Sequence, residues 1–461
     1  MNPHTLPSRR DVLTAGVGLL AAGGLARARP LNPAPRPSSR ARGPATSVVF
    51  MVADGMSIGT FTLADLAIRR QTGRGSAWID LWARPGARRA LVSTRAADSI
   101  VTDSAAGGSA WGCGKRLNNG AINWHEGAAL EPILVSARNA GKATGLVTTC
   151  RVTHATPASF AANVPTRNME AEIATQLLDR RIDLILGGGA KFLTPELLGE
   201  HADLTVVRNA PELERHAHTP GRLVGLFSPD HMAYDRDRTD DQPSLREMSL
   251  LALERLALHP SGFVLQIEGG RVDHGAHAND IVATLFDQIA FDETVRAVSH
   301  WAEQRADTLV IVTTDHGTGG PEFSRYEQQS HECLDRLLGA RHTLSWIGDR
   351  IGETRHDDPA AMFRDLAREH LDAVLSDEQT DWLRRALAGE RTNAFDGANS
   401  LDAAVAAVMA NHLGVGWVST DHTAEHVDAT AIGPGAEALP PSIENFELHR
   451  LVTAALGLRV P

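Results

Sequence analysis

The sequence predicts an α/β fold with a mostly parallel central sheet and helices on both faces. Short apolar runs that are typical of buried strands alternate with amphipathic stretches that are typical of helices. Several of the apolar runs end directly in an acidic residue or in glycine. After Gly320 this alternation breaks, and the helical patterns that follow predict a largely helical insertion before the last sheet strand.

The clearest strand is the continuous apolar run 47–53, which ends at Asp54. Further strands are predicted at 144–148, 182–186, 223–227, 263–267 and 308–314. Amphipathic helices are predicted between or after them at 169–179, 245–256 and 280–304, and in the insertion at 376–387. The sheet is expected to resume at 416–419, just before Asp421 and His422.

The 461 residues can bury a large core, and the net charge of -11 argues against nucleic-acid binding through a basic surface. We expect five segments: a twin-arginine-like signal peptide (1–28), a disordered linker (29–45), the main α/β domain (46–320), an insertion or cap region (321–413) and a return to the α/β domain (414–461).

The N-terminal segment has the three parts of an export signal. The pair Arg9-Arg10 precedes an apolar run, 12–25, and the small-residue cleavage pattern at 26–28 follows. This order predicts an exported protein, periplasmic or extracellular, that uses the twin-arginine route. The alternative is a general export signal in which the arginine pair is a coincidence. The run is too short for a membrane-spanning helix.

Cys113, Cys150 and Cys333 fit no CxxC metal pattern, and their odd number argues against a full disulfide framework. The twin-arginine route carries folded protein from a reducing compartment, where disulfides are rare. One disulfide formed after export remains an open alternative.

Three predicted strands end at acidic residues, namely Asp54, Glu268 and Asp315. In open α/β sheets, ligands bind beyond the carboxyl ends of the strands. Carboxylates gathered there are costly unless cations balance them, so the pattern predicts bound metal ions. The glycine triplet 187–189 lacks the context of a nucleotide-binding loop and is interpreted as a turn.

Histidines accompany these acids at spacings that suit zinc. Asp273 and His277 are four residues apart, so on a helical turn they share one face and can bind one cation. His316 directly follows Asp315, and His422 directly follows Asp421. The alternatives are a capped helix start with surface histidines at 273–277 and an ordinary turn at 315–316.

Ser104 opens a run of small residues that can wind into a helix. A helix N-terminus favours negative charge, which suits a serine that becomes an alkoxide or holds a phosphoryl group. The alternative is that Ser104 is an ordinary N-cap.

Several short motifs, in a fixed order, resemble those of the alkaline phosphatase family of metal-dependent phosphomonoesterases. They cover roughly 46–320 and 416–435. The matching motifs are Val52-Ala53-Asp54-Gly55-Met56, Thr102-Asp103-Ser104-Ala105-Ala106-Gly107, Asn118-Asn119-Gly120-Ala121-Ile122, Thr153-His154-Ala155-Thr156-Pro157, Arg167, Glu268-Gly269-Gly270 with Val272-Asp273-His274, His277 and Asn279, Thr314-Asp315-His316 with Gly319-Gly320, and His422-Thr423.

The resemblance implies a hydrolase of small phosphomonoesters that forms a phosphoserine intermediate and binds two Zn²⁺ and one Mg²⁺, which another divalent ion can replace. It also implies a homodimer. By position, Ser104 matches the nucleophile and Arg167 matches the arginine that holds the phosphate group. The matching metal ligands are Asp54, Asp315 and His316 for the zinc beside the serine, Asp273, His277 and His422 for the second zinc, and Asp54, Thr156 and Glu268 for the magnesium-like ion.

Two histidines depart from the simplest family pattern. His154 stands where family members carry either aspartate or histidine, and an imidazole there favours zinc or cobalt over magnesium at the third site. His426 follows His422 closely and competes with it as a candidate ligand.

Four other functions stay open on the sequence alone: a phosphodiesterase, a sulfatase, a phosphomutase and a non-catalytic exported binder of metal or phosphate. Ser104 lacks the C/S-x-P-x-R context of a sulfatase.

Overall fold

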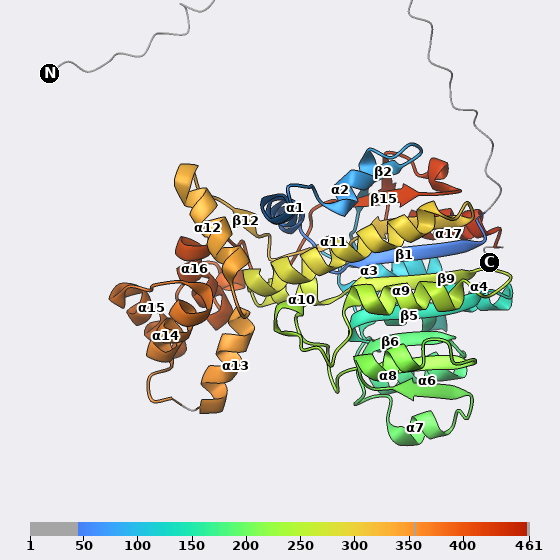
Figure 1. Ribbon diagram of the computed structural model, residues 1–461, viewed down its shortest axis with the longest axis horizontal. Helices are drawn as coiled ribbons and strands as arrows, with labels where there is room; N and C mark the ends of the chain where they lie inside the picture. Colours follow the sequence, from blue (N-terminus) through green and yellow to red (C-terminus); the bar gives the residue numbers. More distant parts are fainter. Residues whose placement is uncertain (1–44, 355, 459–461) are drawn as a thin grey trace, which may run out of the picture. The chain divides into compact units, whose positions relative to one another are not determined.

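A ten-stranded, mostly parallel sheet runs through the computed structural model, which describes residues 45–354 and 356–458 (Figure 1). In spatial order the strands are β16 (Ser442–Glu444), β2 (Arg88–Ser93), β15 (Val427–Ile432), β10 (Thr308–Thr313), β1 (Ser47–Ala53), β9 (Phe263–Gly269), β5 (Ala143–Arg151), β6 (Leu184–Gly188), β8 (Arg222–Leu226) and β7 (Leu204–Val207). The predicted signal peptide and the predicted linker, Ala45 excepted, lie outside the described residues.

Neighbouring strands from β10 to β7 are all parallel, whereas β15 runs antiparallel to both β10 and β2. Every residue of β1 is buried, because both faces of the sheet are covered. The predicted fold class is therefore confirmed. The predicted strands 47–53 and 263–267 begin where β1 and β9 begin, and the other ends differ by at most a few residues.

Two hydrophobic clusters, one on each face, show how helices cover the sheet. Successive side chains of a strand point to opposite faces of the sheet. Accordingly, the first cluster contains Val48, Phe50 and Val52 of β1, and the second contains Val49 and Met51. The first face is covered by α3 (Ser104–Cys113), α4 (Ile133–Asn139), α5 (Ala155–Ala161), α6 (Glu170–Asp179) and α17 (Glu447–Leu456). The second is covered by α2 (Ala77–Trp82), α9 (Leu245–Leu256) and α11 (Ile281–Glu303).

The segment after Gly320 is largely helical, as its sequence pattern indicates. It contains α12 (Glu327–Gly339), α13 (Leu344–Thr354), α14 (Pro359–Leu371), α15 (Asp377–Leu387) and α16 (Leu401–Leu413), drawn in orange to red in Figure 1. A third hydrophobic cluster joins these helices to α11 and to α1 (Ile58–Thr72). The apolar faces of the insertion are thus buried against helices of the sheet-bearing part.

The sheet resumes later than the sequence pattern suggests. Instead of a strand at 416–419, the structure has the two-residue β13 (Val415–Gly416), paired with β12 (Glu322–Phe323) outside the main sheet. The chain rejoins the main sheet only at β15. The segment pairs with β12 through Val415 and Gly416, and Trp417 packs on Gly319, so these residues are held outside the main sheet.

Two further sequence expectations concern membrane spans and cysteines. No helix among the described residues is long and apolar enough to cross a membrane. Cys113, Cys150 and Cys333 are all free thiols.

A cluster of aromatic rings lies beneath two of the helices on the first face. The ring of Phe50 in β1 lies 5.1 Å from that of Trp111 in α3 and 5.3 Å from that of Phe160 in α5, measured between centroids. All three side chains are almost completely buried. The cluster therefore fixes α3 and α5 on the sheet, and with them Ser104 and Thr156.

Substituting Phe160→Ala should lower the free energy of unfolding by about 3–5 kcal/mol, because it leaves a cavity that rigid neighbours fill poorly. Urea unfolding at constant metal content measures this. The control is Leu258→Ala, at a side chain that is 80% exposed, which should change stability by less than about 0.5 kcal/mol. A loss at Phe160 no larger than that of the control would contradict the role of the cluster.

Candidate active site

Carboxylates from three adjacent strands meet at one edge of the sheet. Asp54 directly follows β1, Glu268 lies near the end of β9, and Asp315 follows β10 by two residues. Each is essentially inaccessible to solvent. A fourth carboxylate, Asp273, comes from α10 (Arg271–His277), which begins just after β9. Parallel strands bring their carboxyl ends together, which explains this convergence.

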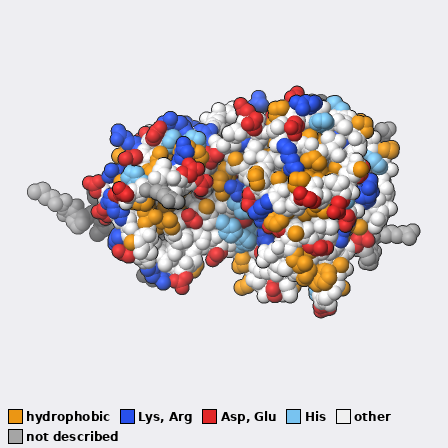
Figure 2. Space-filling model, turned by 90° about the horizontal axis from the view of Figure 1, so that it is seen from below, with side chains coloured by type: hydrophobic (Ala, Val, Ile, Leu, Met, Phe, Trp, Pro, Cys, Tyr) orange, Lys and Arg blue, Asp and Glu red, His pale blue; other side chains and the backbone are white. Residues whose placement is uncertain are grey.

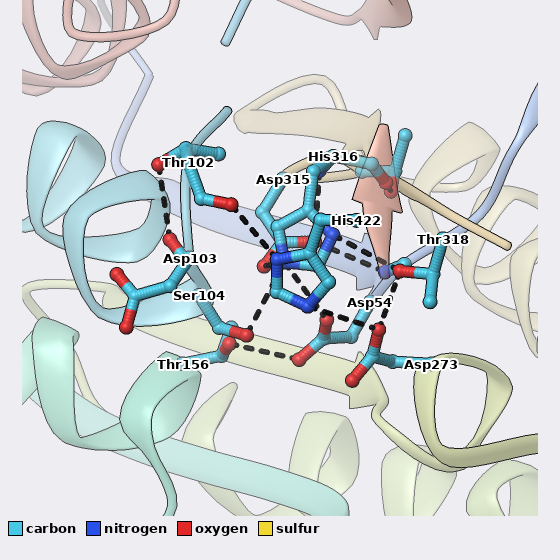
Figure 3. Close-up of polar contacts among 12 residues, drawn as sticks. Asp54, Thr102, Asp103, Ser104, Thr156, Asp273, Asp315, His316, Thr318 and His422 are labelled. Atoms are coloured by element: carbon cyan, nitrogen blue, oxygen red, sulfur yellow. Dashed lines mark hydrogen bonds and ion pairs between the residues drawn. The ribbon is translucent and has the colours of Figure 1, made fainter. Parts of the chain in front are cut away.

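The first candidate metal group consists of Asp54, Asp315 and His316, whose ligand atoms lie within 4.8 Å of one another. His316 Nε2 lies 3.1 Å from Asp315 Oδ2 and 3.8 Å from Asp54 Oδ1. The Ser104 Oγ lies 3.3 Å from the same nitrogen (Figure 3). The hydroxyl thus lies against this group.

Gly55 lets two of these elements approach closely. Its φ of 70° lies in the left-handed region, and an added Cβ would collide with Asp273. Its backbone N–H donates to Asp315 Oδ1 over 3.1 Å. A glycine directly after Asp54 is therefore required by the packing of the carboxylates.

The second group consists of Asp273, His277 and His422. His422 lies in the short strand β14 (His422–Thr423). His277 Nδ1 donates to the Thr420 carbonyl oxygen over 2.6 Å, and His422 Nδ1 donates to the Thr102 carbonyl oxygen over 2.8 Å. A neutral imidazole that donates from Nδ1 has a lone pair on Nε2. The two Nε2 atoms lie only 2.9 Å apart.

Asp273 completes this second group. Its carboxylate oxygens lie 3.5 Å from His277 Nε2 and 3.6 Å from His422 Nε2. Two lone pairs and a carboxylate that face one another repel unless a proton or a cation lies between them. The arrangement therefore fits a bound cation.

The third group consists of Asp54, Glu268 and His154. Thr156, which is predicted to be a ligand, donates to Asp54 Oδ2 over 3.1 Å, and Thr148 donates to Glu268 Oε2 over 2.5 Å. His154 is the N-cap residue of α5, which also carries Thr156. With the Thr156 hydroxyl counted, this group offers more oxygen ligands than the other two, which suits a harder ion.

Several buried carboxylate oxygens lack a hydrogen-bond donor within the described part of the chain: Asp54 Oδ1, Glu268 Oε1 and Asp315 Oδ2. Burial, together with the charges of Asp315, Asp273 and Glu268, raises the pKa of Asp54 well above its usual value. Burial also raises the pKa of Glu268 to about 7. His316 lies near Asp315 Oδ2 and Asp54 Oδ1, but one imidazole cannot balance all these carboxylates, so the arrangement fits bound cations.

Ser104 is the first residue of α3, and Asp103 is the N-cap. Asp103 Oδ1 accepts from the backbone N–H of Ala106, while Oδ2 accepts from Arg167 Nη1 over 3.0 Å. Arg167 Nη2 lies 2.9 Å from His154 Nε2. Arg167, from the loop after α5, thus lies beside the nucleophile candidate with its guanidinium held on two neighbours.

The structure brings together all the residues that the sequence predicts for the site: Asp54, Ser104, His154, Thr156, Arg167, Glu268, Asp273, His277, Asp315, His316 and His422. His426, the competing candidate, is exposed and belongs to none of the metal-ligating groups found among the described residues.

Sequence reasoning missed the supporting residues. Thr148 bonds Glu268, and Thr318 donates to Asp273 Oδ1 over 2.6 Å. Neither threonine stands next to the carboxylate that it contacts, so no local signal indicates them. The role of Asp103 could have been predicted from the sequence, because an Asp directly before a helix is a typical N-cap.

Comparison with known proteins agrees with this geometry. Residues 45–458 match the sequence model of the family described as alkaline phosphatase. The chain is 30% identical over 372 residues to alkaline phosphatase 3 of Bacillus subtilis, covering 78% of this chain and 78% of that protein. It is 30% identical over 333 residues to the tissue-nonspecific alkaline phosphatase of the rat, covering 59% of this chain and 63% of that protein.

Solved structures of alkaline phosphatases have the same fold as this chain. The crystal structure of Thermus thermophilus alkaline phosphatase superposes with a TM-score of 0.84 at 33% identity, covering 91% of this chain and 93% of that one. The cold-active alkaline phosphatase from Shewanella sp. gives a TM-score of 0.77 at 25% identity, covering 89% and 99%. The chain therefore belongs to the alkaline phosphatase family of phosphomonoesterases.

Proposed function

We propose that this phosphomonoesterase acts through a phosphoserine formed on Ser104, with two zinc ions and a third, magnesium-like ion. The observation that carries the proposal is the pair of Nε2 lone pairs of His277 and His422, 2.9 Å apart and facing Asp273. The side chains can hold this arrangement at neutral pH only with positive charge between them. The family as a whole is metal dependent.

The donor atoms fit the proposed ions. Imidazole and carboxylate together suit zinc, so one zinc would be held by Asp54, Asp315 and His316, and the other by Asp273, His277 and His422. Asp54, Thr156 and Glu268 would hold the third ion through oxygen. When bound, these ions would supply positive charge beside the attacking and the leaving oxygen.

The chain's own residues perform the transfer. The Ser104 hydroxyl gives up its proton to water, its oxygen attacks phosphorus, the bond from phosphorus to the alcohol oxygen breaks, and the leaving oxygen takes up a proton from water. Water then hydrolyses the phosphoserine, which releases phosphate and restores the hydroxyl. The position of Ser104 at the start of α3 favours negative charge on Oγ, because the positive end of the helix dipole lies there.

Arg167 binds the phosphate group in this proposal. A planar guanidinium can donate two parallel hydrogen bonds to two phosphate oxygens. Its present partners, Asp103 Oδ2 and His154 Nε2, are acceptors at the same two ends of the guanidinium. They pre-orient the side chain beside Ser104 before substrate arrives.

The export route and the homodimer remain proposals as well. The signal peptide at 1–28 lies outside the described residues. It supports a periplasmic or extracellular location through its sequence pattern alone, and the homodimer rests on family resemblance.

Substituting Ser104→Ala should lower kcat by at least about 10³-fold and abolish labelled phosphoenzyme after acid quenching, because the nucleophile is gone. The matched control is Ser109→Ala in the same helix, whose hydroxyl accepts from the Asn123 N–H. It should retain phosphoenzyme and most activity. Phosphoenzyme that persists in Ser104→Ala would exclude Ser104 as the nucleophile.

Substituting Arg167→Ala should weaken inhibition by inorganic phosphate about 10- to 100-fold, because two charge-assisted hydrogen bonds are lost. Arg167→Lys should recover only part of the affinity, since it keeps the charge but not the planar fork. Arg89→Ala, at an exposed arginine that pairs with Asp428, is the control and should leave inhibition unchanged. Unchanged phosphate inhibition in Arg167→Ala would remove Arg167 from the site.

Chelation should abolish hydrolysis and lower the thermal transition, because the buried carboxylates lose their counter-ions. Elemental analysis before chelation should give two zinc ions per chain, and zinc with magnesium should restore activity. The stabilisation by the ions should grow with pH, because they displace protons from carboxylates and imidazoles. Full activity in protein that holds less than one metal ion per chain would contradict the proposal.

A further inference from the structure

A further group of potential ligands adjoins the site, and two of its members, Cys150 and His274, have no part in the proposed reaction. Cys150 ends β5, His154 caps α5, and His274 lies in α10. One ligand atom from each of the three lies within 4.8 Å of the others. Figure 2 shows that histidine side chains gather on the face seen there, with lysine or arginine side chains next to them.

The spacing of the sulfur and the nearest imidazole fits a shared ion. Cys150 Sγ lies 3.7 Å from His274 Nδ1. In a tetrahedral zinc site with ordinary Zn–S and Zn–N bond lengths, these two ligand atoms are separated by about 3.5 Å. The two atoms therefore already stand about as far apart as a bound pair.

The tautomer of His274 is also the one that a metal ligand needs. Arg271 Nη1 lies 3.0 Å from His274 Nδ1, and an arginine can only donate. The lone pair of the ring is therefore on Nδ1, the nitrogen nearest Cys150. An ion there would displace Arg271, whose guanidinium keeps a second contact, since it lies 3.8 Å from the ring centroid of Tyr234.

His154 carries a buried ring nitrogen without a hydrogen-bond partner. Its Nδ1 is buried and has no hydrogen-bond partner in the described part of the chain, while Arg167 donates to Nε2. A buried polar atom without a partner is unfavourable for the folded protein. An ion on Nδ1 would remove this cost; the ring proton would then move to Nε2, and Arg167 would leave that nitrogen.

We propose that Cys150, His154 and His274 form a fourth divalent-ion site, which takes a thiolate-binding ion such as Zn²⁺, Co²⁺ or Cd²⁺ in preference to Mg²⁺. A sulfur and two imidazole nitrogens are soft or borderline ligands, and Mg²⁺ binds oxygen. On binding, Cys150 releases its S–H proton to solvent and its sulfur bonds the ion. This site is distinct from the oxygen-rich set of Asp54, Thr156 and Glu268.

The orphaned Glu268 Oε1 supplies nearby negative charge for the added ion. Cys150 Sγ and Glu268 Oε1 both lie against Gly270, where a Cβ would approach the sulfur to 2.5 Å and the oxygen to 2.8 Å. The carboxylate of Glu268 therefore places negative charge near Cys150 Sγ, which offsets the arginines nearby.

The test adds Co²⁺ or Cd²⁺ to the zinc- and magnesium-loaded protein. Wild type should bind one further equivalent by elemental analysis and develop the near-ultraviolet absorption of a thiolate–metal bond. Cys150→Ser should lose both signals, while Cys113→Ser and Cys333→Ser keep them, because neither cysteine belongs to a metal-ligating group among the described residues. His274→Gln should weaken binding of the further equivalent at least 10-fold.

Three outcomes overturn the proposal: no thiolate band in wild type, a band that persists in Cys150→Ser, or one that disappears equally in Cys333→Ser. Far-ultraviolet circular dichroism and urea unfolding establish that each variant folds. Ser104→Ala should retain both the band and the further equivalent. A failure of the phosphoserine mechanism is therefore distinguishable from a failure of this site.

Discussion

The crowding of four buried carboxylates at one edge of the sheet is the constraint on which the rest of the site depends. Asp54, Glu268, Asp273 and Asp315 are all nearly inaccessible to solvent. Two like charges 4 Å apart repel by roughly 4 kcal/mol at an effective dielectric constant of 20. Several such pairs would exceed the net stability of a domain, which is about 5–15 kcal/mol. At neutral pH these carboxylates must therefore either keep protons or share cations, and the raised pKa values of Asp54 and Glu268 reflect the same crowding.

Neutral hydrogen-bonding groups around the carboxylates and imidazoles fix where such cations can bind. Thr148 donates to one oxygen of Glu268, and Thr156 donates to one oxygen of Asp54. The other oxygen of each carboxylate has no donor among the described residues. The Thr420 carbonyl oxygen accepts from Nδ1 of His277, and the Thr102 carbonyl oxygen accepts from Nδ1 of His422. Each contact leaves the Nε2 lone pair of the ring available to a metal ion. One atom of each pair is thus committed to the protein, and its partner remains available as a ligand.

Asp103, at the start of α3, contacts both Arg167 and the helix that carries Ser104. Asp103 caps the helix with one oxygen and holds Arg167 with the other, so a single side chain sets both the helix N-terminus beneath Ser104 and the resting position of the arginine. His154 holds the other end of Arg167 and also belongs to two groups of potential metal ligands. His154, a potential metal ligand, and Arg167, the proposed phosphate ligand, are therefore in direct contact.

The sequence by itself determined the fold class, the helical insertion and the residues of the candidate site. Apolar runs such as 47–53 mark strands buried on both faces, and an acid at the end of such a run marks a ligand-binding edge. Only the tertiary structure decided which atoms meet. The 2.9 Å approach of His277 and His422 joins residues 145 positions apart, and Thr148, Thr318 and Cys150 lie near their partners only because strands and helices are packed together. Such contacts leave no local pattern in the sequence, because they depend on strand order and on side-chain direction. For the same reason, the sequence did not show that the strand predicted at 416–419 pairs with β12 outside the main sheet.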